Sequence, residues 1–229
     1  MPSKDMSQTD LLECLETETG ANPTASVIWL HGLGADGGDF YPIVPELRLP
    51  ASMPTRFVFP NAPVQPVTIN GGMHMRAWYD IFLPNIIPRE DDTGIRQTET
   101  AINRLIEREI ARGIPSTRIV LAGFSQGCAI TLHTGIRTTH KLAGLMGLSG
   151  YLPLLAAADS EHSGANNQTP IFLAHGLFDP VVTIDRAQAA QQKLTKMGYQ
   201  VQWETYPMPH SVCPQEIHDI SVFLQKALA

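Results

Sequence analysis

Short apolar runs recur along the chain, and most are followed by a longer segment with apolar residues at helical spacing. This alternation predicts βαβ units, hence an α/β fold with a mostly parallel central sheet flanked by helices on both faces. The runs predicted as strands are residues 25–30, 55–59, 118–122, 142–148, 170–174 and 199–205. The last run alternates apolar and polar residues, which indicates a position nearer the sheet edge.

Four segments have the pattern of amphipathic or buried helices: residues 94–112, 126–137, 182–197 and 211–228. In the first, apolar residues gather on one face, with Arg and Glu opposite. Gly113 and Gly198 follow two of these segments, at the position where glycine commonly ends a helix.

Two segments do not fit this alternation. Residues 60–92 are rich in Pro, Gly and Asn but also carry large apolar side chains, so we expect a folded excursion over one edge of the sheet. The alternative is a plain surface loop with a local core. Residues 156–169 are small and polar, which predicts a mobile, solvated loop.

Composition narrows the class of protein. The 229 residues, 43% of them hydrophobic, suit a single globular domain over residues 1–229, with an inserted pocket-covering segment at about 60–92. The net charge of -6 argues against a nucleic-acid partner. Three widely spaced cysteines predict neither a disulfide framework nor a thiolate zinc site. No signal peptide and no apolar run of about 20 residues is evident, so we expect a soluble, cytoplasmic protein without a transmembrane segment.

Residues 123–127 read Gly-Phe-Ser-Gln-Gly and match the G-x-S-x-G pattern. They follow a predicted strand and precede a predicted helix, which is the context in which this motif exposes a nucleophilic serine on a sharp turn. Ser125 is therefore the candidate nucleophile, and a serine hydroxyl needs a histidine base oriented by a carboxylate.

The chain order of this motif class, serine then acid then histidine, restricts the acid. Asp179 comes just after the predicted strand 170–174, at the carboxyl end of the sheet where sites form. Its alternative role is to cap the following helix. Asp185 is a second acid candidate, but it lies inside that helix.

His210 is the candidate base because it follows the last predicted strand, in a turn before the final helix. It should therefore lie at the same end of the sheet as the other two side chains. His175, beside a strand end, is expected to be a hydrogen-bonded structural residue. The remaining downstream histidines lie on the nucleophile's own helix, in the soft loop or on the last helix: His133, His140, His162 and His218.

A developing oxyanion needs hydrogen-bond donors already in place. The backbone N–H of Gln126, at a helix start, is one candidate. Leu33, in the glycine-rich loop after the first predicted strand, offers the other. A phosphate cradle is the alternative for this loop, but neither GxGxxG nor a Walker lysine is present.

Taken together, the segments LHGLGADGGDF, FPNAPVQPVTINGGMHMRAWYDI, GFSQGCAI, HGLFDPVV and YPMPHSV resemble the phospholipase/carboxylesterase family of α/β-hydrolases, which includes bacterial carboxylesterases and acyl-protein thioesterases. The resemblance implies the same triad and oxyanion residues, and a segment around residues 63–81 that lines or covers the acyl site, with Trp78 near the pocket. It implies no metal or other cofactor. Bacterial members are often dimers, although the sequence itself leaves monomer and homodimer open. Pro209 departs from the family, where a glycine commonly precedes the histidine.

The sequence thus predicts a serine carboxylesterase that hydrolyses short- to medium-chain esters of small molecules through an acyl-enzyme. A lysophospholipase or acyl-protein thioesterase is an alternative with the same chemistry, and a non-catalytic ligand-binding protein is an alternative of another class. An adaptable apolar acyl pocket is expected, for which ordinary core packing is the alternative. Its candidate residues are Met73, Met75, Trp78, Phe82 and Leu177.

Overall fold

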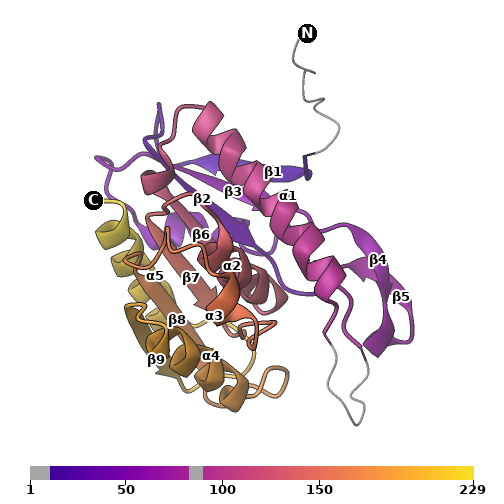
Figure 1. Ribbon diagram of the computed structural model, residues 1–229. Helices are drawn as coiled ribbons and strands as arrows, with labels where there is room; N and C mark the ends of the chain where they lie inside the picture. The colour runs from indigo at the N-terminus through magenta and orange to yellow at the C-terminus, as the bar shows by residue number, and fades with distance from the viewer. Residues whose placement is uncertain (1–10, 83–89) are drawn as a thin grey trace, which may run out of the picture.

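The centre of the molecule is a twisted sheet, seen in Figure 1 from one of its covered faces. The computed structural model describes residues 11–82 and 90–229. In these residues the sheet contains seven strands, which are β1 (Cys14–Glu18), β2 (Ala25–Leu30), β3 (Thr55–Pro60), β6 (Ile119–Phe124), β7 (Gly144–Leu148), β8 (Ile171–Gly176) and β9 (Val201–Tyr206). Their spatial order is β1-β3-β2-β6-β7-β8-β9. All neighbouring pairs are parallel except β1 with β3, so the predicted mostly parallel sheet is confirmed.

Helices cover both faces of this sheet (Figure 1). On one face, α1 (Asp92–Ala111), α2 (Gln126–Arg137) and α4 (Ile184–Lys196) bury their apolar residues against the strands. On the other face, α5 (Pro214–Ala227) and the 3-10 segment η2 (Tyr41–Leu47) do the same. Because both faces are covered, strands such as β2 and β8 are buried at every residue, which explains their largely apolar sequences. The short 3-10 turn η4 (Ser116–Arg118) leads into β6.

The predicted helices are confirmed, with small changes at their ends. Helix α2 has the expected bounds, and α1 and α4 are followed by Gly113 and Gly198, both with positive φ. Helix α5 begins three residues later than expected. Its start coincides with Pro214, whose missing N–H and fixed φ suit the first helical position. None of the helices that the structure describes is long and apolar enough to span a membrane.

Three strands are absent from the sequence-based prediction. Strand β1 is a half-exposed edge strand antiparallel to β3. Strands β4 (Val64–Val67) and β5 (Met73–Arg76) pair as a separate antiparallel hairpin around the 3-10 turn η3 (Thr68–Asn70). The hairpin lies within the 60–92 segment, beside the start of α1 in Figure 1. Residues 83–89 of that segment lie outside the described residues.

The prediction of a purely solvated loop at 156–169 is wrong. The segment contains a short helix, α3 (Ala158–Glu161), and its residue Asn166 is completely buried. The Asn166 side chain accepts a hydrogen bond from the Leu142 N–H and donates to the carbonyl oxygens of Gly135 and His140. These contacts anchor the segment to the core, which its polar composition did not indicate.

Helix α5 carries a buried carboxyl group in its first turn. Glu216 is fully shielded from solvent. Burial raises the pKa of Glu216 to about 8, and the nearby backbone N–H of Cys213 offsets only part of this rise. Between the two pKa values the folded protein therefore keeps a proton on Glu216. An unfolded chain, in which glutamate has a pKa of about 4.3, releases that proton.

This difference predicts a pH-dependent stability. Because the pKa of Glu216 is raised in the folded state, its contribution to the free energy of unfolding is fully present at pH values below the unfolded-state pKa. That contribution is lost as the pH rises through the folded-state pKa of about 8. Glu216→Gln, which mimics the protonated group, should be more stable than the wild type at pH 8.5 by a few kcal/mol in urea denaturation. The advantage should shrink at pH 5. The exposed residue Glu107 provides the control, since Glu107→Gln removes a carboxyl group that is not buried. An equal difference between Glu216→Gln and wild type at both pH values would contradict this account.

Candidate active site

Ser125 occupies a strained turn between β6 and α2. Its φ of 56° and ψ of -117° are rare for a residue with a side chain, and its N–H donates to the carbonyl of Leu148 on β7 at 2.8 Å. The flanking glycines permit this turn, because a Cβ at Gly123 would lie 2.2 Å from the Gly127 oxygen. The motif therefore forms the strand-to-helix elbow that its sequence context predicts.

Asp179 lies in the tight turn that follows β8. Its Oδ1 accepts hydrogen bonds from the N–H groups of Val181 and Val182, at 2.8 and 2.9 Å. Helix α4 begins only at Ile184, so Asp179 organises the turn before the helix and does not cap it. These two bonds orient the second oxygen, Oδ2, and the side chain is fully buried.

His210 joins the two preceding side chains. Its Nδ1 lies 2.6 Å from Asp179 Oδ2, and its Nε2 lies 2.9 Å from Ser125 Oγ. The ring also packs against Phe124, with 4.8 Å between centroids. The three predicted side chains, taken from the ends of β6, β8 and β9, therefore form one continuous hydrogen-bonded line. Asp185, the other acid candidate, lies on α4 and has no recorded bond to this histidine.

The partners determine the tautomer of His210. An ionised carboxylate can only accept, so the proton lies on Nδ1 and Nε2 is free to accept from the serine hydroxyl. This is the arrangement in which a histidine can remove the proton of a serine nucleophile.

His175 supports the acid from within the sheet. Its Nε2–H donates to the Val182 carbonyl at 2.8 Å, and the same nitrogen lies 3.5 Å from Asp179 Oδ2. Burial lowers the pKa of His175. The ring is completely shielded from solvent, as expected of a hydrogen-bonded structural residue near the acid.

The loop after β2 approaches the nucleophile closely. A Cβ at Gly32 would lie 3.4 Å from the Ser125 Cβ, so this stretch of backbone passes beside the serine. The Gly32 carbonyl and the Ala35 N–H close a turn with Leu33 and Gly34 at its centre. On the other side of the serine, Gln126 is the first residue of α2, where the N–H groups have no partner within the helix.

The five acyl-pocket candidates fall into different environments. Met73 and Leu177 are strongly exposed, whereas Met75 and Phe82 are half-buried. Trp78 is 1% exposed and is part of the core under α1, which is the core packing named as the alternative for these residues.

Two large apolar residues near the site were missed by the sequence analysis. Phe178 and Val181 flank Asp179 and are 69% and 65% exposed. The sequence feature that could have identified them is the apolar character of Gly-Leu-Phe-Asp-Pro-Val-Val, which is unusual for a solvent-facing turn. With Leu177 they give the loop that carries the acid an apolar outer surface.

His133, on the nucleophile's own helix, has no part in this line of residues. His133 is buried on α2 and bonds Glu99 of α1 at 2.9 Å. Among residues 11–82 and 90–229, no group of three His, Cys, Asp or Glu side chains is arranged to hold a metal ion.

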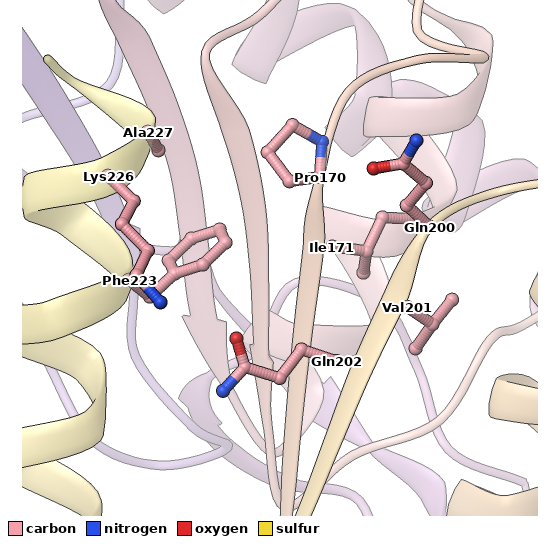
Figure 2. A pocket seen from close by; sticks show the side chains of 8 residues that line it. All are labelled: Pro170, Ile171, Gln200, Val201, Gln202, Phe223, Lys226 and Ala227. Atoms are coloured by element: carbon pink, nitrogen blue, oxygen red, sulfur yellow. The ribbon is translucent and has the colours of Figure 1, made fainter.

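A groove of about 370 Å³ lies between α5 and the beginnings of β8 and β9 (Figure 2). Its walls include Ile171, Gln202 and Phe223. It is at the amino ends of the strands, opposite Ser125, and has no part in the candidate site.

Sequence comparison places this chain among known hydrolases. The family model described as Phospholipase/Carboxylesterase matches residues 12–228. Acyl-protein thioesterase 1 of Gibberella zeae is 40% identical over 214 residues, covering 90% of this chain and 91% of that protein. The protein of the same name from Neurospora crassa is 41% identical over 218 residues, covering 91% and 89%.

Solved structures share the fold over nearly the whole chain. Arabidopsis thaliana SOBER1 has a TM-score of 0.83 at 29% identity and covers 90% of this chain and 99% of its own. Zea mays acyl-protein thioesterase 2 also has a TM-score of 0.83, at 26% identity, covering 95% and 99%. The chain is a hydrolase that belongs to the phospholipase/carboxylesterase family of α/β-hydrolases.

Proposed function

We propose that this protein is a serine hydrolase that removes acyl chains from thioesters, with S-acylated cysteines of proteins as the substrate class and oxygen esters as further substrates. The observation that carries the proposal is the line Ser125–His210–Asp179, with separations of 2.9 and 2.6 Å. The relatives named acyl-protein thioesterase support the thioester class over the short-chain carboxylesterase expected from the sequence.

The reaction proceeds by two acyl transfers. His210 takes the Ser125 proton as Oγ attacks the acyl carbon, and the N–H groups of Leu33 and Gln126 hold the oxyanion. His210 then protonates the leaving group, and water attacks the acyl-enzyme by the same route. Asp179 remains charged and orients the imidazole.

A thioester suits this group of side chains because its thiol leaving group needs little protonation to depart. A cysteine thiol has a pKa of about 8.5, far below that of an alcohol, so sulfur departs with less protonation by His210. The apolar surface of residues 177–181 supports an acyl chain of several carbons, since burying each methylene contributes about 0.8 kcal/mol.

A chain-length and leaving-group series tests this proposal. Octanoyl and palmitoyl thioesters of a cysteine peptide, and p-nitrophenyl esters from acetate to palmitate, should be compared by released thiol and released p-nitrophenol. We expect kcat/KM for octanoyl substrates to exceed that for acetyl substrates at least about tenfold. The enzyme should deacylate the peptide.

The Ser125→Ala variant provides the blank in every assay. If p-nitrophenyl acetate is the fastest substrate and the S-acyl peptide is not hydrolysed, the result would favour the short-chain carboxylesterase. Absence of turnover for every substrate would favour the non-catalytic ligand-binding alternative.

A further inference from the structure

Trp78 is buried, and the partners of its two N–H groups lie on two different segments of the chain. Its indole Nε1–H donates to the His31 carbonyl at 2.8 Å, and its backbone N–H donates to the side-chain Oε1 of Gln126 at 2.8 Å. The Trp78 and His31 rings are also in contact, with 5.0 Å between centroids. One residue thus joins the loop after β2 to the start of α2.

The hydrogen bonds of His31 determine its protonation. Its Nε2 accepts from the backbone N–H of Ala62 at 3.1 Å, so that nitrogen carries no proton. Nδ1 must then be protonated, and it donates to the Gly32 carbonyl at 2.6 Å. Burial lowers the pKa of His31, which keeps the ring in this neutral form.

This donor orients the predicted oxyanion N–H. A trans peptide is planar, so its C=O and N–H point in opposite directions. The His31 ring and the Ala35 N–H both hold the Gly32 oxygen on one side. The N–H of the same peptide, which belongs to Leu33, therefore points away from the His31 ring, on a stretch of backbone that passes beside Ser125.

The Gln126 side chain connects the second oxyanion donor, the Gln126 backbone N–H, to the same tryptophan. Its carboxamide accepts from Trp78 N–H and donates to the Tyr79 carbonyl at 2.8 Å, and it is almost fully buried. The residue whose backbone N–H is the other oxyanion candidate is thereby tied to the Trp78–Tyr79 backbone.

We propose that Trp78 is a positioning residue for the oxyanion hole, because it links the His31–Gly32–Leu33 loop to Gln126 and so fixes the separation of the two donors. The inference rests on the proposed function. It gives Trp78 a role different from the acyl-pocket wall expected from the sequence.

The test is Trp78→Phe, which keeps an aromatic ring but removes the indole N–H. Complete loss of an oxyanion donor typically costs about 100- to 1000-fold in turnover, so a misplaced donor should lower kcat about 10- to 30-fold. KM should remain within about twofold, and the loss should be equal for acetyl and octanoyl esters. An alkyl boronic acid, which mimics the tetrahedral state, should bind more weakly by the same factor as kcat falls.

Trp29 provides a matched control. It lies on β2, two residues before His31, and is equally buried, but its indole N–H has no hydrogen-bond partner within the described part of the chain. Trp29→Phe should therefore lower the melting temperature without changing kcat. Gln126→Met retains the backbone N–H but loses the carboxamide that bonds Trp78, so it should reproduce the kcat loss. If Trp78→Phe does not fold, the kcat of Gln126→Met tests the inference in its place.

Several outcomes would overturn the inference. A kcat for Trp78→Phe or Gln126→Met equal to that of Trp29→Phe would do so, as would a loss confined to long-chain esters. Imidazole ¹⁵N NMR of the wild type should find His31 protonated on Nδ1 alone at pH 7, and an Nε2–H form would contradict the arrangement. Because Ser125→Ala tests the proposed function separately, an inactive Ser125→Ala beside a fully active Trp78→Phe would remove only this inference.

Discussion

Replacing Ser125 with alanine is expected to lower kcat by about 10⁶-fold, the cost of removing a serine nucleophile from an intact triad. The hydroxyl lies 2.9 Å from His210 Nε2, the nitrogen placed to take its proton. No other group on the elbow can form the acyl-enzyme in its place. The measurement is the steady-state rate with p-nitrophenyl octanoate, together with mass spectrometry of the intact protein for an acyl adduct.

The control for this variant is Ser149→Ala. Ser149 follows the adjacent strand β7, is buried and has a φ of 48°, so alanine there meets a similar backbone strain. We expect its activity to stay within about twofold of wild type, because its hydroxyl is not bonded to His210. Equal losses in the two variants would mean that backbone strain, and not the Ser125 hydroxyl, explains the effect.

Asp179→Asn is expected to lower kcat by about 10⁴-fold, since an amide favours the wrong histidine tautomer. The asparagine Oδ1 can still accept from Val181 and Val182, so the turn should remain folded. Its Nδ2, however, can only donate toward His210 Nδ1, and the proton would then move to Nε2, where it blocks general-base action. The pre-steady-state rate of acylation measures this loss directly.

Asp185→Asn is the matched change for the acid. This aspartate lies in the first turn of α4, six residues away, and is not bonded to His210. Its substitution should leave acylation unchanged and lower the melting temperature slightly through the helix dipole. A slow Asp185→Asn enzyme beside an active Asp179→Asn enzyme would reverse the assignment of the acid.

Five of the six strands that the sequence predicted are buried on both faces, and the sixth, β9, is a half-buried edge strand whose alternating sequence revealed it. Residues 25–30 and 171–176 are largely apolar because helices bury both of their sides. Strand β1 (CLETE) and the hairpin strands β4 and β5 were missed because each is half-exposed and carries polar residues. A hydrophobic pattern reports burial, so it gave little signal for these short strands, whose apolar residues are few and partly exposed.

The candidate catalytic residues could be selected from chain order and strand ends, because parallel strands bring their carboxyl ends to one edge. The supporting contacts could not. The bond between Trp78 and the His31 carbonyl joins residues 47 positions apart in the chain. The bond that holds the buried Asn166 to the Gly135 carbonyl joins residues 31 positions apart. Such bonds leave no local pattern, and composition alone suggested a pocket wall and a solvated loop instead.

The end of the chain lies far from the chemistry. The Arg118 side chain, at the end of η4 just before β6, donates to the carbonyl of Ala229, whereas Ser125 follows the end of that strand. A strand of this length spans about 20 Å. A peptide tag or a solid support attached at Ala229 would therefore sit on the side opposite Ser125, the candidate nucleophile. Immobilisation through Ala229 should leave the end of the sheet that carries Ser125 facing the solution.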